Sequence, residues 1–262
     1  MQVTDKTYQE HRIFNELQRY IDFYERLSMS VFSFATLGTP AACNIDTYVY
    51  SSMQGTIESI KTILLTGRIN DAYALMRKYY DSAVINIYSN LYLKNNFSID
   101  SLIVENINNW LQGKEKLPEY RVMSEYIKSS EVLKPINDVF GADKRYKHLR
   151  DRCNDHTHYN FYHHAMLNDN KIHIGGRGWW LDRFYDDVRD IFVFHLGYIF
   201  FLNDHYLISS DYLDALECGV PPDENSQYWV APFIQEVFDK IITPRRPEVT
   251  AVIKTKSTMQ LS

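Results

Sequence analysis

The apolar residues at the start of the chain recur at helical intervals, and this periodicity constrains the fold more than any other feature. Within residues 5–35 the intervals alternate between four and three residues, along the series Ile13, Leu17, Tyr20, Tyr24, Leu27, Val31 and Phe34. Because an α-helix has about 3.6 residues per turn, these side chains form one continuous stripe. The pattern predicts a long helix that buries this stripe against other helices.

The same periodicity returns along most of the chain. It predicts long helices over residues 45–66, 70–94 and 181–208. Shorter helices are expected within residues 98–111, 119–140, 142–162 and 226–241. Gly67 follows the second long helix and is expected to cap its C-terminus. Strands and helices do not alternate, so the sequence predicts an all-α bundle of long antiparallel helices.

Two segments depart from the helical pattern. Residues 165–180 alternate around an Asn-Asp-Asn sequence and contain several glycines, which predicts a small irregular or β-hairpin insertion. Residues 243–262 are expected to form an extended or flexible C-terminal tail. Residues 1–242 are then expected to form a single α-helical domain.

Composition excludes several classes of function. The formal net charge is -5, so any contact with nucleic acid must use a local basic patch. The three cysteines lie far apart and form no CxxC pair, which fits a reducing compartment. The N-terminus is polar, and the most apolar run, residues 191–202, is too short to span a bilayer. We therefore expect a cytoplasmic protein without a membrane segment.

Residues 150–164, RDRCNDHTHYNFYHH, contain four of the nine histidines in the chain. His156 and His158 form an HxH pair, but on a helix they point about 200° apart at about 100° per residue. The i, i+4 histidine pair of zinc-binding HExxH helices is absent. We expect no metal and no other cofactor, and a metal-dependent hydrolase that uses the histidine cluster remains an alternative.

Cys153 and His156 offer a second chemistry. Their i, i+3 spacing allows contact on a helix, and a cysteine nucleophile needs a neighbouring group that lowers the pKa of its thiol. The surrounding sequence matches no recognised motif of cysteine hydrolases. A buried structural cysteine is the simpler interpretation.

Metal-free acid–base chemistry on a phosphodiester is the third interpretation. Histidine transfers protons near neutral pH, and the arginine guanidinium matches the oxygens of a phosphate. Attack of an RNA 2′-OH on its own phosphate needs these groups and no cofactor. Arg150, Asp151 and His156 supply them within seven residues.

This arrangement of arginine, a polar residue, four further residues and histidine, late in a helical bundle, resembles the HEPN superfamily. Many HEPN proteins are metal-independent endoribonucleases of toxin–antitoxin, antiviral and CRISPR-linked systems, in which two subunits bring their motifs together. The resemblance implies that Arg150 stabilises the phosphate, His156 transfers protons and Asp151 fills the polar position. Arg152 and His158 have the same spacing and give a second register.

Residues 64–84 carry a second resemblance, to the helix-turn-helix of uncharacterised HEPN-like bacterial proteins. The matching positions are Gly67, Ala74, Leu75, Arg77 and Asp81. Arg77 and Asp81 stand at i, i+4 and are expected to pair with each other. The resemblance implies that they support the site around Arg150 and His156.

Basic residues precede the histidine cluster. Lys144, Arg145 and Lys147 are the candidates for contact with an RNA backbone, and a solvated helix face is the alternative. For the aromatic residues that follow, Tyr159, Phe161 and Tyr162, we expect packing in the core in preference to stacking on bases.

The sequence therefore favours a metal-independent endoribonuclease that serves as a toxin or anti-phage effector. The resemblance implies RNA as partner, a homodimer, and an antitoxin or another defence protein as a further partner. A non-catalytic HEPN-like helical protein that binds a partner protein or a nucleotide is the alternative.

Overall fold

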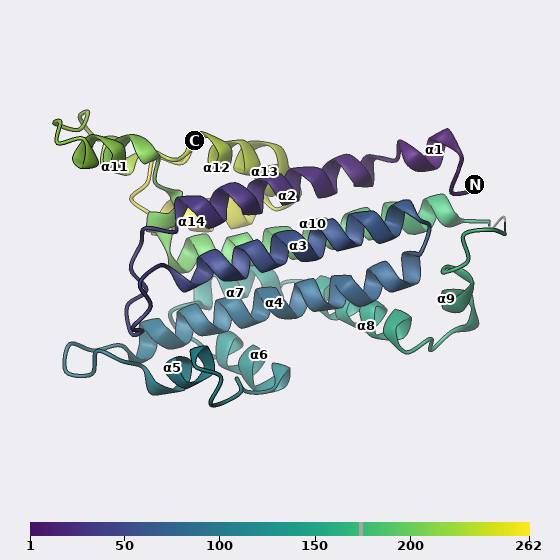
Figure 1. The fold of residues 1–262 in the computed structure, drawn as a ribbon, viewed down its shortest axis with the longest axis horizontal. Coiled ribbons are helices and arrows are strands. Elements are labelled where there is room, and N and C mark those ends of the chain that lie inside the picture. Colours follow the sequence, from purple (N-terminus) through teal and green to yellow (C-terminus); the bar gives the residue numbers. More distant parts are fainter. Residues whose placement is uncertain (173–174) are drawn as a thin grey trace. The chain divides into compact units, whose positions relative to one another are not determined.

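A computed structural model describes residues 1–172 and 175–262, and helices make up most of this part of the chain (Figure 1). Four long helices carry the periodicity seen in the sequence: α2 (Arg12–Ser30), α3 (Ile45–Leu65), α4 (Ile69–Asn96) and α10 (Arg177–Leu202). The described residues contain no strand, only two isolated bridges, Gly38–Ile103 and Ile208–Val230. The all-α helical bundle expected from the sequence is confirmed.

Shorter helices complete the chain. The first half contains α1 (Lys6–Gln9), α5 (Glu105–Leu111) and α6 (Tyr120–Lys128). The second half contains α7 (Lys134–Gly141), α8 (Arg145–Thr157), α9 (Tyr162–Met166), η1 (Asp204–Leu207), α11 (Ser210–Glu217), η2 (Ser226–Tyr228), α12 (Pro232–Val237), the π-helical η3 (Phe238–Ile242), α13 (Thr243–Arg245) and α14 (Pro247–Lys256). None of the helices in the described ranges is long and apolar enough to cross a membrane.

The chain divides into two compact units, and each long helix contributes residues to both. Unit 1 comprises residues 1–25, 48–83 and 143–192. Unit 2 comprises residues 26–47, 84–142 and 193–262. Unit 1 therefore contains α8, α9 and every residue that the sequence proposes for a site.

Aromatic side chains fill the core of unit 1. The rings of Tyr20 and Phe192 stack at 4.0 Å, and the hydroxyls of Tyr24 and Tyr79 are 2.9 Å apart. The stripe predicted for α2 is buried from Ile13 to Val31, although the helix ends at Ser30. Packing of such stripes, and not helix propensity alone, holds long helices of this kind in place.

Gly67 joins α3 to α4 as the sequence predicted. Its φ of +84° lies in the left-handed region, where glycine has no steric penalty, and its N–H donates to the Leu64 carbonyl at 2.8 Å. A Cβ at this position would lie 2.3 Å from a methyl carbon of Val3. Both the backbone conformation and the contact with Val3 therefore require glycine.

A buried polar network lies in the core of unit 2. His195 is fully buried, and its Nε2–H donates to Asn86 Oδ1 at 2.9 Å. Asn86 and Asn90 donate in turn to Asp46 Oδ1, and the Tyr206 hydroxyl donates to Asp46 Oδ2 at 2.9 Å. These bonds link α3, α4, α10 and η1, so His195 has a structural role.

The last twenty residues correct the sequence prediction. In place of an extended tail, Thr243–Arg245 form α13 and Pro247–Lys256 form α14, with a break at Arg246. Pro247 begins α14 after the non-helical Arg246, so its missing N–H removes no helical hydrogen bond, while Pro244 lies where α13 directly continues the π-helical η3. Val249 and Ile253, four residues apart, are buried, so α14 belongs to the core of unit 2.

The segment near 165–180 agrees in part with the prediction of an irregular or β-hairpin insertion, since its described residues contain turns and no hairpin. Its residues up to 172 form the end of α9 and turns, and α10 begins at Arg177, four residues earlier than the predicted helix. No strand pairing occurs in the described part of this segment, while residues 173 and 174 of the predicted hairpin lie outside the described residues. Arg177 is fully buried and donates to the carbonyls of Met1 and Asp169.

Candidate functional site

Helix α8 carries most of the candidate residues, and its sequence decides which of them are buried. The buried positions are Tyr146, Leu149, Cys153 and His156, at intervals of three, four and three residues. This is the helical spacing of a core-facing stripe, and His156 continues it. The opposite side exposes Lys144, Lys147, His148 and Asp151.

His156 lies in a stack of aromatic rings in unit 1. Its ring is 4.0 Å from the rings of Tyr73 and His164, nearly parallel to both, and Trp180 meets it edge-on at 5.2 Å. The residue is fully buried. Burial, together with smaller contributions from the neighbouring His164 and His163, lowers the pKa of His156 to about 3, so the ring is neutral at physiological pH.

Asn70 fixes the tautomer of that neutral ring. His156 Nδ1 lies 2.9 Å from Asn70 Oδ1, and because an amide oxygen only accepts, Nδ1 carries the proton. Nε2 then presents a lone pair. This atom is buried and has no hydrogen-bond partner among the residues that the structure describes. An unpaired buried polar atom costs about 1–3 kcal/mol, so it calls for an explanation.

Arg150 and Asp151 do not share the burial of His156. Arg150 is half-buried and Asp151 is exposed. On an ideal helix Arg150 and His156 diverge by about 120°. The three residues of the proposed motif therefore lie on one helix but at three different depths.

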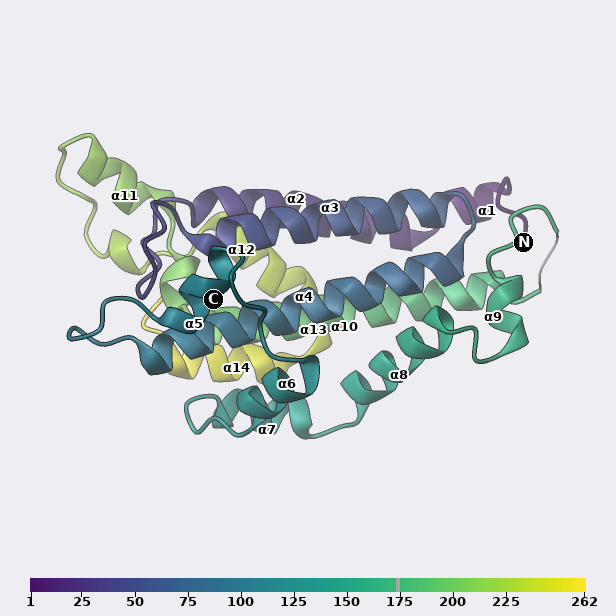
Figure 2. The ribbon, with the colours of Figure 1, turned by 60° about the horizontal axis from the view of Figure 1, so that its bottom comes forward.

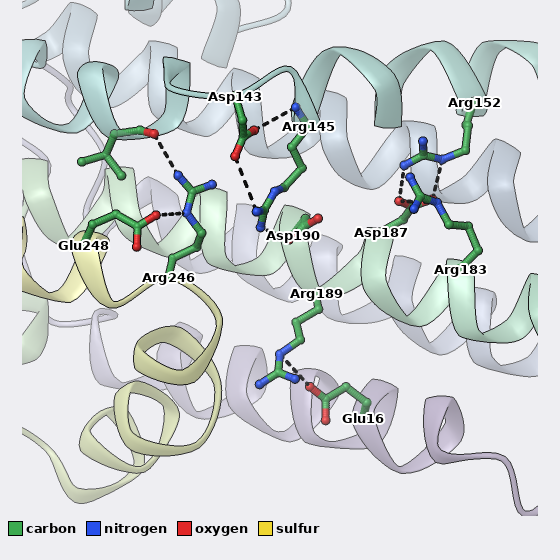
Figure 3. Close-up of polar contacts among 11 residues, drawn as sticks. Glu16, Asp143, Arg145, Arg152, Arg183, Asp187, Arg189, Asp190, Arg246 and Glu248 are labelled. Carbon is green, nitrogen blue, oxygen red and sulfur yellow. Dashed lines mark hydrogen bonds and ion pairs between the residues drawn. The ribbon is translucent and has the colours of Figure 1, made fainter.

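Arg152 has a defined structural partner on α10. Its Nε donates to Asp187 Oδ2 at 2.9 Å, and its Nη2 donates to Asp187 Oδ1 (Figure 3). Asp187 is almost completely buried, accepts a hydrogen bond from the Tyr73 hydroxyl at 3.1 Å, and lies 3.6 Å from Arg183 Nε. Burial raises the pKa of Asp187, and the hydrogen bonds from Arg152 oppose that rise.

His158, the partner of Arg152 in the second register, is exposed at the end of α8. Arg152 is held by Asp187, whereas His158 points to solvent. The second register therefore pairs an arginine that anchors α8 to α10 with a histidine on the surface.

Arg77 and Asp81 on α4 pair as the sequence predicted. Arg77 Nε donates to the two carboxylate oxygens of Asp81 at 3.0 and 2.9 Å. Arg77 Nη1 also donates to Asn154 Oδ1 on α8, one turn after Arg150. The pair therefore holds the last turn of α8, within the span of the proposed motif.

Of the proposed RNA contacts, only the two lysines are exposed. Arg145 is half-buried and its Nη1 donates to Asp190 Oδ1 on α10 at 3.0 Å, with Asp143 3.5 Å away (Figure 3). Lys144 and Lys147 are exposed. Arg145 therefore anchors the start of α8, while the lysines face solvent.

The aromatic residues after α8 correct the sequence prediction of core packing. Tyr159, Phe161 and Tyr162 are 50%, 53% and 83% exposed. The reason is local: α8 ends at Thr157, and Tyr159 takes a left-handed conformation with a φ of 49°. Because the helix ends before Tyr159, the helical spacing no longer directs these three side chains towards the core.

The structure bears on two of the other interpretations, a cysteine nucleophile at Cys153 and a metal site in the histidine cluster. Cys153 is fully buried, and burial raises the pKa of its thiol far above the ordinary value, which disfavours the thiolate that a nucleophile needs. Within the described ranges no three His, Cys, Asp or Glu side chains converge as metal ligands. His156 is buried and His158 exposed, so the HxH pair points apart.

In comparisons with known proteins, no family model matches this chain, and no curated protein or solved structure is significantly similar to it. The function must therefore be argued from the site itself.

Sequence reasoning missed three parts of this site. Asn70, Tyr73 and Asp187 come from other helices, and only the burial stripe of α8 hinted that His156 would need partners. Asp187 carried one signal in the sequence. It belongs to the predicted buried helix, where an acidic residue requires a partner of opposite charge.

Proposed function

We propose that this protein is a metal-independent endoribonuclease of the HEPN type that serves in toxin or anti-phage defence. The observation that carries the proposal is the orientation of His156. Its Nδ1–H is held by Asn70, and Nε2 presents a lone pair without a partner among the described residues. A general base oriented by a third group has this arrangement.

In the proposed reaction, His156 Nε2 takes the proton of an RNA 2′-OH. The 2′-oxygen then bonds to the adjacent phosphorus, the bond to the 5′-oxygen breaks, that oxygen takes a proton from water, and His156 Nε2 returns its proton to solvent. The products are a 2′,3′-cyclic phosphate and a 5′-hydroxyl. Arg150 is proposed to stabilise the charge on the phosphate, with Asp151 beside it. Arg77 and Asp81 would act as positioning residues, since Arg77 holds α8 at Asn154.

The burial of His156 favours a second candidate, a non-catalytic helical protein of the same type that binds a partner protein or a nucleotide. Nε2 is shielded from solvent, and the lowered pKa makes His156 a weak base. In that case the ring stack of Tyr73, His156 and His164 serves stability alone.

Cleavage of labelled RNA in the presence of EDTA separates the two candidates. The proposal expects a 2′,3′-cyclic phosphate product from the wild type, and a loss of about 100-fold or more for Arg150→Ala, since general acid–base and charge-stabilising groups contribute about that much. His156→Phe keeps a ring in the stack and tests proton transfer apart from packing.

His158→Ala is the matched control, because this exposed histidine lies two residues away. If Arg150→Ala and His156→Phe cleave as fast as the wild type while His158→Ala does not, the register with Arg152 is correct. If no RNA is cleaved by the wild type, and His156→Phe lowers only stability, the second candidate stands.

A further inference from the structure

The segment that follows α8 exposes an unusual number of aromatic rings. Tyr159, Phe161 and Tyr162 on the loop and on α9 are joined by Trp179 on the first turn of α10, which is 61% exposed. Figure 2 shows α9 beside the start of α10. We call these four side chains the aromatic surface; all belong to unit 1.

Ring contacts connect the two parts of the aromatic surface. Phe161 stacks on His163 at 5.8 Å, His163 stacks on Trp180 at 5.7 Å, and Trp180 meets Trp179 edge-on at 4.7 Å. His163 is itself exposed. Phe161, His163, Trp180 and Trp179 therefore form a connected series that leads to α10, and Phe161, His163 and Trp179 in it are exposed. Large exposed apolar groups of this kind mark interaction sites.

The charge of the same segment indicates the partner. Residues 144–181 contain seven lysines and arginines against three aspartates and no glutamate, within a chain of net charge -5. Three of the arginines (Arg145, Arg152 and Arg177) are engaged inside the unit. The exposed cations are lysines: Lys144 and Lys147 lie at the start of α8, and Lys171 lies between α9 and α10.

We propose that the aromatic surface binds single-stranded RNA by stacking unpaired bases on its exposed rings, while the three lysines contact the phosphates. Tyrosine, phenylalanine and tryptophan rings are the usual platforms for unpaired bases, and every base offers a flat face. The inference deepens the proposed function: it names the form of RNA and the surface that holds it.

A second copy of this chain is the less favourable occupant. A two-fold interface places the same segment, with its excess of positive charge, against itself. Like charges opposed across an interface cost free energy, whereas phosphates would neutralise them. Tyr159 and Tyr162 also carry a hydroxyl group and Trp179 an indole N–H. Such polar groups suit a hydrated contact with nucleic acid.

The test measures binding without cleavage. A fluorescein-labelled oligonucleotide of twelve 2′-O-methyl uridines lacks the attacking hydroxyl, so its anisotropy reports affinity alone. Stacking is worth about 1–3 kcal/mol per base, or about 5- to 150-fold in affinity. Trp179→Ala and Tyr162→Ala are each expected to weaken binding at least about fivefold, and Trp179→Phe, which retains a flat ring, is expected to restore most of the affinity.

Tyr48→Ala is the matched control, because Tyr48 is another strongly exposed aromatic residue of unit 1, on α3. It is expected to bind like the wild type. Equal affinity for Trp179→Ala, Tyr162→Ala and Tyr48→Ala would overturn the proposal. So would sedimentation showing that the Trp179→Ala and Tyr162→Ala changes together turn a dimer into a monomer without weakening RNA binding, since the surface would then join two copies.

The same measurements keep this inference apart from the proposed cleavage. If the wild type binds the oligonucleotide through Trp179 and Tyr162 but cleaves no RNA, the endoribonuclease proposal fails and the binding surface stands. If RNA is cleaved, and the loss of both rings changes neither affinity nor cleavage rate, the surface fails and the cleavage proposal stands.

Discussion

Removal of the Asp187 carboxylate tests most directly whether Arg152 anchors α8 to α10. Asp187 is 1% exposed and accepts two hydrogen bonds from Arg152 and one from Tyr73. Asp187→Ala would leave the Arg152 guanidinium partly buried beside Tyr73 without its counter-charge. This change is expected to destabilise the protein without disturbing any exposed residue of α8.

The magnitude follows from the two kinds of lost contact. Breaking a buried ion pair by removing one partner costs about 3–5 kcal/mol. Arg152 is 22% exposed, so water partly replaces its partner and the lower end applies. The Tyr73 hydroxyl loses its acceptor, which adds about 1 kcal/mol. We therefore expect a loss of about 3–4 kcal/mol, or a Tm lower by roughly 6–16 °C.

Urea unfolding followed by circular dichroism measures this loss, and two further variants interpret it. Asp138→Ala breaks the pair with Lys134, in which both side chains are more than half exposed, and should cost less than about 1 kcal/mol. A double variant, Arg152→Met with Asp187→Leu, removes both charges and should recover part of the stability. A loss below about 1 kcal/mol for Asp187→Ala, or no recovery in the double variant, would refute the reasoning.

Three further predictions concern stability and reactivity. Burial lowers the pKa of His156 and of His195 from 6.5 to about 3, so between these pH values the unfolded chain binds more protons than the folded protein. The free energy of unfolding should be highest above about pH 6.5 and should fall by up to about 1.4 kcal/mol per pH unit for each histidine as the pH drops towards 3. In a series of urea unfolding curves at different pH values, His156→Phe should weaken this pH dependence. A Cβ on Gly197 would lie 2.7 Å from the Phe140 ring, so Gly197→Ala should lower the free energy of unfolding by about 1–3 kcal/mol. Gly55 on α3 faces open space, so Gly55→Ala should raise that free energy by about 0.5–1 kcal/mol. Equal changes in Tm for the two variants would contradict the close packing at Gly197. Exposed Cys218 should react with a thiol reagent at once, and buried Cys153 only on unfolding, as mass spectrometry of the labelled native protein can establish.

The sequence by itself determined the class of fold and the positions of the long helices. Apolar periodicity is a local property, since residues three and four apart share a helix face in any context. It therefore located α2, α3, α4 and most of α10. Local rules also account for the left-handed turn at Gly67 and for the Arg77–Asp81 pair, whereas the contact of Gly67 with Val3 is tertiary.

The tail was mispredicted for a related reason. Residues 243–256 contain two prolines, which read as helix breakers when their position in a helix is unknown. In the structure Pro247 begins α14, Pro244 is the second residue of α13, which directly continues η3, and burial of Val249 and Ile253 in unit 2 stabilises α14. Packing against the rest of the unit decided what local propensity left open.

The roles of the titratable residues were decided only by tertiary structure. The sequence presented Arg150, Arg152, His156 and His158 as near equivalents. Burial then distinguished them, because partners 35 and 86 residues away hold Arg152 and His156. The burial and the hydrogen bonds of a side chain depend on which other helices pack against it. The spacing of residues along one helix does not contain that information. The sequence therefore determines which side chains lie on α8, and the packing of the other helices determines which of them are exposed to solvent.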